Sequence, residues 1–240
     1  GLGSLIIFAL TLLYFRYRLK RGMTQASLFA MGASMSNTGF IGSAVLTLLL
    51  ESHAAVYLSL TLIIENLCIV ACTLILAEGA QQQQSSWWRL YAQTLLKLVK
   101  NPVIIAIILG MLCAAFKLQL PHFLTQTLHL LGQTASPLAL FIIGAGLVGL
   151  SFEQLNRDSV VLVAIKLILM PITIFALFNL FSAPQEMRYA GTLLAVLPMP
   201  VAFVIFADQY GIKGQALAPL MLSTLVGFLL LALLLSIWQI

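Results

Sequence analysis

Long apolar segments recur along the whole chain, and short polar connectors separate them. A helix that crosses the roughly 30 Å hydrocarbon core of a bilayer needs about 20 mainly apolar residues. Of the 240 residues, 61% are hydrophobic and only 8% are charged, whereas soluble domains carry about 25% charged residues. The sequence therefore predicts an all-α polytopic membrane protein. The eight expected spans cover residues 1–15, 26–50, 54–77, 101–116, 123–150, 159–181, 187–207 and 214–238.

The basic residues are distributed unequally between the two sides that these spans define. Assigning alternate connectors to opposite sides places nine Lys and Arg residues on one side and two on the other. Because cytoplasmic loops carry the excess of positive charge, the side with nine is predicted to be cytoplasmic. The net charge of +5 thus reflects orientation in a lipid bilayer, and no nucleic-acid partner is expected. The nine are Arg16, Arg18, Lys20, Arg21, Arg89, Lys97, Lys100, Arg157 and Lys213, and the two are Lys117 and Arg188.

The longest connector, residues 80–100, has a composition unlike that of the others. It begins with the glutamine tract Gln81 to Gln84 and continues with Trp87, Trp88 and several basic residues at helical spacing. Basic residues alternating with Trp and Leu favour a helix that lies at the lipid headgroups. We predict a cytoplasmic loop with an interfacial helix, and a solvated linker with aromatic anchors is the alternative.

The sequence contains no pattern that indicates an enzyme or a metal site. The three cysteines, Cys68, Cys72 and Cys113, lie in apolar segments without C-x-x-C spacing or a neighbouring histidine. Motifs such as H-E-x-x-H and G-x-S-x-G are missing from the chain. We therefore expect no catalytic residues, no metal and no cofactor.

Two of the predicted spans are interrupted at matching places. A shift of 162 residues carries Ser36 onto Pro198, Glu65 onto Gly227 and Leu76 onto Trp238, so that spans one to three match spans six to eight. An odd number of membrane crossings separates the first span from the sixth, so the two copies would be inverted. Inverted repeats with paired broken helices indicate a secondary transporter with its substrate site near the membrane midplane.

The two interruptions supply the first candidate binding residues. In one, Asn37, Thr38 and Gly39 can leave the helical ladder open and expose backbone N–H groups at the start of a half-helix, an end that suits a carboxylate. In the other, two prolines remove backbone donors. We predict substrate contacts at both breaks, although simple kinks remain the alternative. The residues predicted to contact substrate at the second break are Pro198, Met199 and Pro200.

Two ionisable residues lie inside predicted spans. Glu65 is followed by Asn66 in the middle of the third span, where a charged side chain costs about 2.5 to 3.5 kcal/mol even on translocon scales. Glu65 is predicted to line the substrate site with Asn66, and it could release a proton, coordinate a cation, pair with a base or make a structural hydrogen bond. Lys166 in the sixth span could neutralise Glu65, attract an anionic substrate or extend to the interface. Both are predicted coupling residues.

Three motifs in this order resemble the auxin efflux carrier family, which includes plant auxin exporters and bacterial carriers of malate and malonate. They are Ser36-Asn37-Thr38-Gly39-Phe40-Ile41-Gly42, Lys100-Asn101-Pro102, and Leu197-Pro198 followed by Phe203 to Tyr210. The chain departs from the family pattern at Ser36, where a proline often sits.

This resemblance implies ten helices in two inverted five-helix repeats, with two scaffold helices and three transport helices in each and two broken helices that cross. About eight of the ten helices would lie in this chain, and two would precede Gly1. Residues 1–79 would then be transport helices of the first repeat, 80–100 the loop, 101–150 scaffold helices of the second repeat and 151–240 its transport helices. A homodimer through the scaffold helices is a candidate assembly.

The expected function is secondary active transport of small organic anions by alternating access across the bacterial cytoplasmic (inner) membrane. The resemblance implies carboxylates such as malate or malonate, or auxin-like acids, with coupling to H⁺ or Na⁺. A channel or a non-transporting membrane scaffold is the alternative, although neither explains two matched helix breaks.

Overall fold

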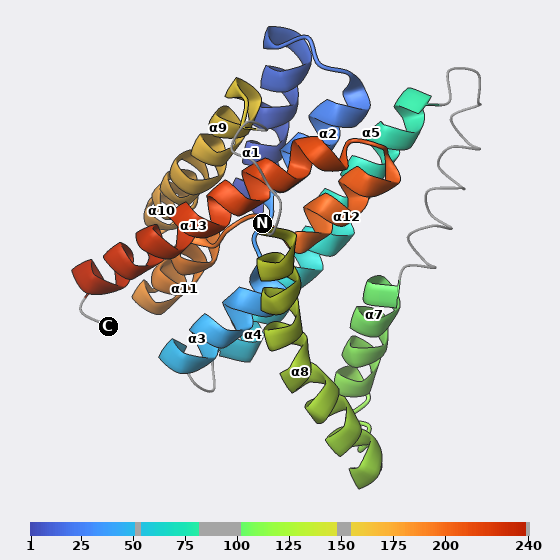
Figure 1. Cartoon of the computed structure of the whole chain (residues 1–240). Coiled ribbons are helices and arrows are strands. Elements are labelled where there is room, and N and C mark those ends of the chain that lie inside the picture. Colours follow the sequence, from blue (N-terminus) through green and yellow to red (C-terminus); the bar gives the residue numbers. More distant parts are fainter. Residues whose placement is uncertain (51–53, 82–101, 148–154, 239–240) are drawn as a thin grey trace.

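The computed structural model describes residues 1–50, 54–81, 102–147 and 155–238 of the chain. Every regular element in these ranges is a helix, which confirms the prediction of an all-α protein for the part described (Figure 1). Most of the predicted loop at residues 80–100 lies outside these ranges. The α-helices are α1 (Leu2–Leu13), α2 (Met23–Ser34), α3 (Ser43–Leu50), α4 (Ala54–Ile64), α5 (Ala71–Gln81), α7 (Pro102–Ala115), α8 (His122–Leu147), α9 (Arg157–Ala164), α10 (Met170–Leu180), α11 (Gln185–Val196), α12 (Val201–Gln209) and α13 (Lys213–Trp238).

Within the described residues, four short π-helical segments join or extend these helices. They are η1 (Tyr14–Arg18), η2 (Thr38–Gly42), η4 (Glu65–Val70) and η6 (Ile165–Leu169). The segment η4 connects α4 to α5, and η6 connects α9 to α10, so each forms the middle of one long helix. Such π turns inside long helices often lie at functional sites.

Several helices are long and apolar enough to cross a membrane. Within the described residues these are Val56–Ala80, Arg157–Leu180 and Lys213–Trp238, and the pair α11 and α12 makes a fourth if it counts as one bent span. Each lies where the sequence predicts a span. The further helices α1, α2, α7 and α8 also fall on predicted spans, but the total of eight remains a prediction.

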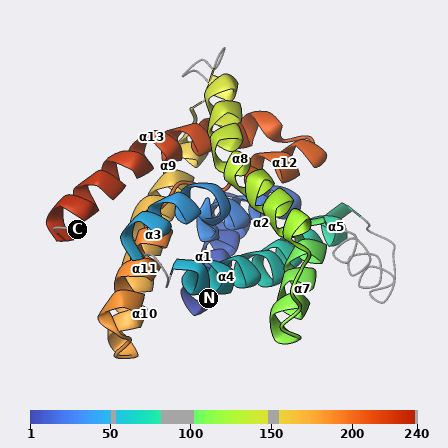
Figure 2. The ribbon, with the colours of Figure 1, turned by 90° about the horizontal axis from the view of Figure 1, so that it is seen from below.

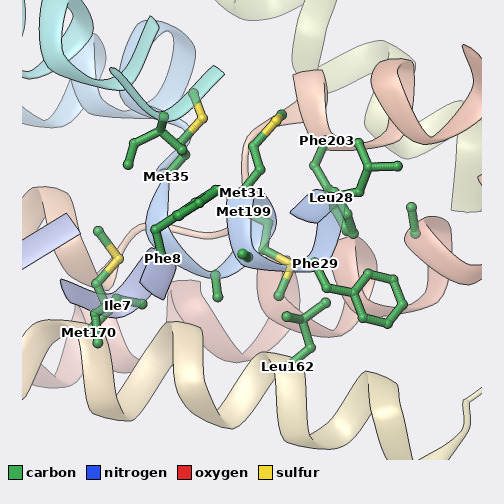
Figure 3. Close-up of a cluster of buried hydrophobic side chains, with 14 of the residues drawn as sticks. Ile7, Phe8, Leu28, Phe29, Met31, Met35, Leu162, Met170, Met199 and Phe203 are labelled. Atoms are coloured by element: carbon green, nitrogen blue, oxygen red, sulfur yellow. The ribbon is translucent and has the colours of Figure 1, made fainter. Parts of the chain in front are cut away.

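Helix α2 occupies the centre of the main bundle. Each residue from Ala26 to Ser34 is buried, because α1, α5, α9 and α12 pack around this helix. The many small residues of α2 allow neighbouring helices to approach it closely, which is the usual basis of helix packing in membranes. A Cβ atom added at Gly32 would lie 3.2 Å from the ring of Phe203, so α12 packs directly on this glycine. Figure 3 shows the apolar side chains that α1, α2, α9, α10 and α12 contribute around α2.

Helices α7 and α8 lie apart from this bundle. They form a helical pair that extends from it, and many of their described side chains are exposed (Figures 1 and 2). The contacts of the pair with the bundle run from α8 to η2 and from α7 to η4. The bundle therefore packs around α2 largely without the α7–α8 pair.

The turn between α1 and α2, the end of α5, the start of α9 and the turn between α12 and α13 lie toward one end of the bundle (Figure 1). There the Arg21 Nε atom lies 2.7 Å from the Asp158 Oδ2 atom, joining the start of α2 to the start of α9. The Tyr210 hydroxyl donates to the Glu78 carboxylate at 2.8 Å, joining the end of α12 to α5. Burial and this hydrogen bond raise the pKa of the Tyr210 phenol, so the donor stays protonated. These contacts hold the ends of distant helices together.

Candidate functional site

The first helix break begins where α2 ends at Ser34. The Met35 N–H makes the last helical bond, to the Met31 carbonyl at 3.0 Å, and Met35 itself is extended with φ −108° and ψ 156°. Helical structure resumes at Thr38 after Asn37, whose φ and ψ are −75° and 54°. Ser and Asn favour such interruptions because their side chains compete for backbone hydrogen bonds. The break therefore falls on the residues that the sequence predicts.

The second break separates α11 from α12. Leu197 leaves the helix with φ −58° and ψ 150°, and α12 begins only after Pro200. Pro198 and Pro200 cannot donate backbone hydrogen bonds, and each ring would clash with the preceding helical turn. The two helices are bent by 44° relative to one another.

The two breaks are in direct contact. The Asn37 N–H donates to the Pro198 carbonyl at 2.9 Å, so a backbone donor freed by the first break satisfies a carbonyl in the second. The Met199 N–H donates to the Ser223 hydroxyl of α13 at 3.2 Å. Asn37 and Met199 are both buried, and Ser223 is completely inaccessible to solvent. We call this contact between residues 35–38 and 197–200 the crossing.

Glu65 lies against the first break. Its Oε1 atom accepts a hydrogen bond from the Ser36 N–H at 2.9 Å, a donor that has no helical partner because the backbone is extended at Met35. The side chain is only 2% exposed. The Thr38 hydroxyl lies beside the same carboxylate, although without good hydrogen-bond geometry. The carboxylate therefore sits where the second half-helix begins, the end at which negative charge is favoured.

Lys166 reaches the crossing from η6. Its Nζ atom donates to the Ser36 hydroxyl at 2.7 Å and to the Ala195 carbonyl at 3.1 Å, and it lies 3.0 Å from the Met170 sulfur. The side chain is completely buried, so it does not extend to the membrane interface. Ala195 is in the last turn of α11, where carbonyls lack helical partners and positive charge is favoured.

Ser36 links the two ionisable residues. Its backbone N–H binds Glu65 and its hydroxyl binds Lys166, so one residue in the first break contacts both charges. Glu65 belongs to η4 and Lys166 to η6, the two π turns in the middle of long helices. Burying charges in a membrane is tolerable when opposite charges and backbone groups compensate one another. The crossing thus holds two buried ionisable side chains of opposite charge type that bind the same serine.

Two buried donors at the crossing, the Thr38 hydroxyl and the Asn37 amide, have no hydrogen-bond partner within the described part of the chain. The Asn37 Nδ2 atom is inaccessible to solvent and makes no hydrogen bond there, and the residue is only 3% exposed. Buried amides of this kind nearly always have partners, because an unmade bond costs about 1 to 3 kcal/mol. The free Asn37 amide can donate two hydrogen bonds to an acceptor that enters the crossing.

The remaining predicted site residues lie differently. Pro198, Met199 and Pro200 are buried in the crossing, and Thr38 is buried beside Glu65. Gly39 is exposed, one residue beyond the buried part of the break. The Asn66 amide donates to the Leu62 carbonyl of its own helix at 2.9 Å. The described residues contain no group of three His, Cys, Asp or Glu side chains that could hold a metal ion.

Three contributors to the crossing were not among the predicted residues. Ser36, Ser223 and the Ala195 carbonyl all make hydrogen bonds there. A serine in the middle of an apolar span, four residues before the glycine that the repeat aligns with Glu65, is a signal that could have identified Ser223. The Ala195 carbonyl is a backbone group and has no such signal.

Apolar membrane-spanning helices and two broken helices in contact define an integral membrane protein of the kind that encloses a polar site between helices. The chain matches the family model described as "Membrane transport protein" over residues 1–238. It belongs to this family, and the resemblance to auxin efflux carriers is confirmed. The chain is also 24% identical over 225 residues to a Rhizobium meliloti (strain 1021) protein named "Putative malonate transporter", covering 92% of this chain and 70% of that protein.

Proposed function

We propose that this protein is a secondary active transporter that carries small organic anions, carboxylates such as malonate or malate, by alternating access. The observation that carries this proposal is the unpartnered Asn37 amide in the crossing. Donors at the start of a half-helix suit a carboxylate, and secondary transporters place their substrates at such broken helices. The name of the Rhizobium meliloti relative supports a dicarboxylate, and auxin-like acids share the same carboxylate group.

The proposed architecture is a pair of inverted five-helix repeats. The 162-residue shift that aligns Ser36 with Pro198 also aligns Glu65 with Gly227. Glu65 accepts the Ser36 N–H, whereas Gly227 packs against Pro198, and a Cβ atom added there would lie 3.4 Å from the Pro198 nitrogen. Corresponding residues therefore face corresponding breaks, and the carboxylate faces Ser36, which has a backbone N–H, whereas the glycine faces Pro198, which has none. These contacts support the repeat.

In this architecture α7 and α8 belong to the scaffold, against which the other helices would move. Their separation from the bundle supports this assignment (Figure 1). A homodimer would form through the same scaffold helices, and the bilayer would be the bacterial cytoplasmic membrane. The end of the bundle that holds Arg21, Arg157 and Lys213 would face the cytoplasm.

The proposed coupling ion is the proton, carried by Glu65. Glu65 and Lys166 bind the same residue, Ser36, which brings the two opposite charges to one place. When Glu65 is ionised, it compensates the Lys166 ammonium; when Glu65 is protonated, that positive charge needs another anion. A substrate carboxylate bound at Asn37 can supply this negative charge. Proton and substrate would therefore bind together, and a proton gradient would drive accumulation of the anion.

Counterflow in sealed vesicles tests this function. Vesicles containing the protein and loaded with unlabelled malonate are expected to accumulate labelled malonate transiently above its equilibrium level, with an initial rate that saturates as external malonate increases. A carrier gives this result because inward and outward movements share one site. Saturation without counterflow, or uptake that rises linearly with malonate, would indicate a channel. No flux of any organic acid would favour a non-transporting scaffold.

A further inference from the structure

The surroundings of the Lys166 ammonium resemble those of a bound cation. A hydroxyl oxygen of the first break and a carbonyl oxygen at the end of α11 accept hydrogen bonds from the Nζ atom, and the Met170 sulfur lies 3.0 Å from it. The Glu65 carboxylate, which accepts the N–H of the same serine, supplies a negative charge at the crossing. Hard monovalent and divalent cations prefer such oxygen ligands. In transporters with broken helices, carbonyls at half-helix ends coordinate Na⁺. Lys166 places its charge among ligands of this kind.

We propose that Lys166 is a tethered cation that fills a sodium-type site at the crossing. The side chain enters from η6, is fully buried, and brings its charge to both breaks, since it binds Ser36 in one and Ala195 beside the other. Because the position is permanently occupied, the protein needs no Na⁺ for its structure. If the proposed transport function is also correct, uptake is sodium-independent.

Shortening Lys166 should convert this position into a real ion site. Lys166→Ala removes the four side-chain atoms beyond Cβ and leaves the Ser36 hydroxyl, the Ala195 carbonyl and the Glu65 charge without their cation. A small cation can then enter the vacated space and restore the charge balance. The variant is therefore expected to bind Na⁺ or Li⁺, whereas choline is too large to enter.

Thermal unfolding of the protein in nanodiscs measures cation binding at the crossing without any transport assay. The unmodified protein is expected to have the same Tm in NaCl, LiCl and choline chloride at equal ionic strength. The Tm of Lys166→Ala should be lower in choline and should rise with Na⁺ by about 3 to 6 °C per tenfold increase above the dissociation constant. Lys166→Ser, which adds a hydroxyl ligand, should respond in the same way.

Two control variants separate a specific site from a general salt effect. Lys166→Met keeps the bulk of the side chain and leaves no space for an ion, so its Tm should not depend on Na⁺. The double variant Lys166→Ala/Glu65→Gln has no charge to balance and should also be insensitive. A sodium-dependent Tm in the unmodified protein would overturn the proposal. So would an equal Tm of Lys166→Ala in Na⁺ and choline, or failure of both short variants to fold in NaCl.

Discussion

Replacing Glu65 by glutamine is expected to abolish proton-driven accumulation of malonate while leaving counterflow intact. Glutamine keeps a carbonyl oxygen that can accept the Ser36 N–H, which now lies 2.9 Å from the Glu65 Oε1 atom, so the break should keep its geometry. The amide cannot release a proton, and Glu65→Gln thus imitates the protonated carboxyl at every pH. Exchange of substrate across the membrane needs no change of protonation, whereas accumulation does.

The measurement is uptake of labelled malonate into proteoliposomes with and without an inward proton gradient, followed by counterflow at several pH values. Glu78→Gln is the matched control, because this carboxylate lies in the following helix, α5, and binds Tyr210 at the end of the bundle. Glu78→Gln should keep the response to the gradient. If Glu65→Gln accumulates malonate in response to the gradient as the unmodified protein does, Glu65 carries no coupled proton.

Replacing Asn37 by alanine is expected to weaken malonate binding by roughly tenfold to a hundredfold. The lost interaction is a hydrogen bond from the Asn37 amide to a charged carboxylate, which is worth about 1.5 to 3 kcal/mol, and about 1.4 kcal/mol corresponds to a tenfold change. The backbone bond from Asn37 to Pro198 at 2.9 Å does not involve the side chain. The contact between the two breaks should therefore persist in Asn37→Ala, and the Tm without substrate should change little.

Titration calorimetry with malonate on the purified protein measures the change in malonate affinity. Asn66→Ala provides the control, since the Asn66 amide donates to Leu62 within its own helix and should not contact substrate. We expect the affinity of Asn66→Ala to match that of the unmodified protein. Equal affinities for Asn37→Ala and the unmodified protein would remove Asn37 from the binding site.

The positions of the helix breaks and of Glu65 could be predicted because each disturbs a simple pattern. A carboxylate in an apolar span, two prolines close together and an Asn-Thr-Gly sequence can each be recognised in the sequence alone. Asn66 was predicted to line the substrate site because it follows Glu65 in the sequence. Successive residues of a helix point about 100° apart, so the Asn66 amide bonds within its own helix while Glu65 faces the crossing.

The partners of Lys166 could not be predicted in the same way. Its two oxygen acceptors lie 130 and 29 residues away along the chain, and one of them is a backbone carbonyl that any residue could supply. Which helix faces Lys166 depends on how the spans pack, and the repeat alone does not determine this. The sequence shows that a charge lies in a span, but only packing decides whether it reaches the interface or the crossing.

Solid-state NMR can place the substrate at the crossing most directly. The protein is labelled with ¹⁵N in its asparagine side chains, saturated with carboxyl-¹³C malonate in lipid, and examined by ¹³C–¹⁵N dipolar recoupling beside Asn37→Ala, also saturated. We expect dephasing of the malonate carboxyl signal that corresponds to a hydrogen-bonded separation, and its loss in Asn37→Ala. Malonate that binds both proteins but shows the same dephasing in each would contradict substrate binding at the crossing.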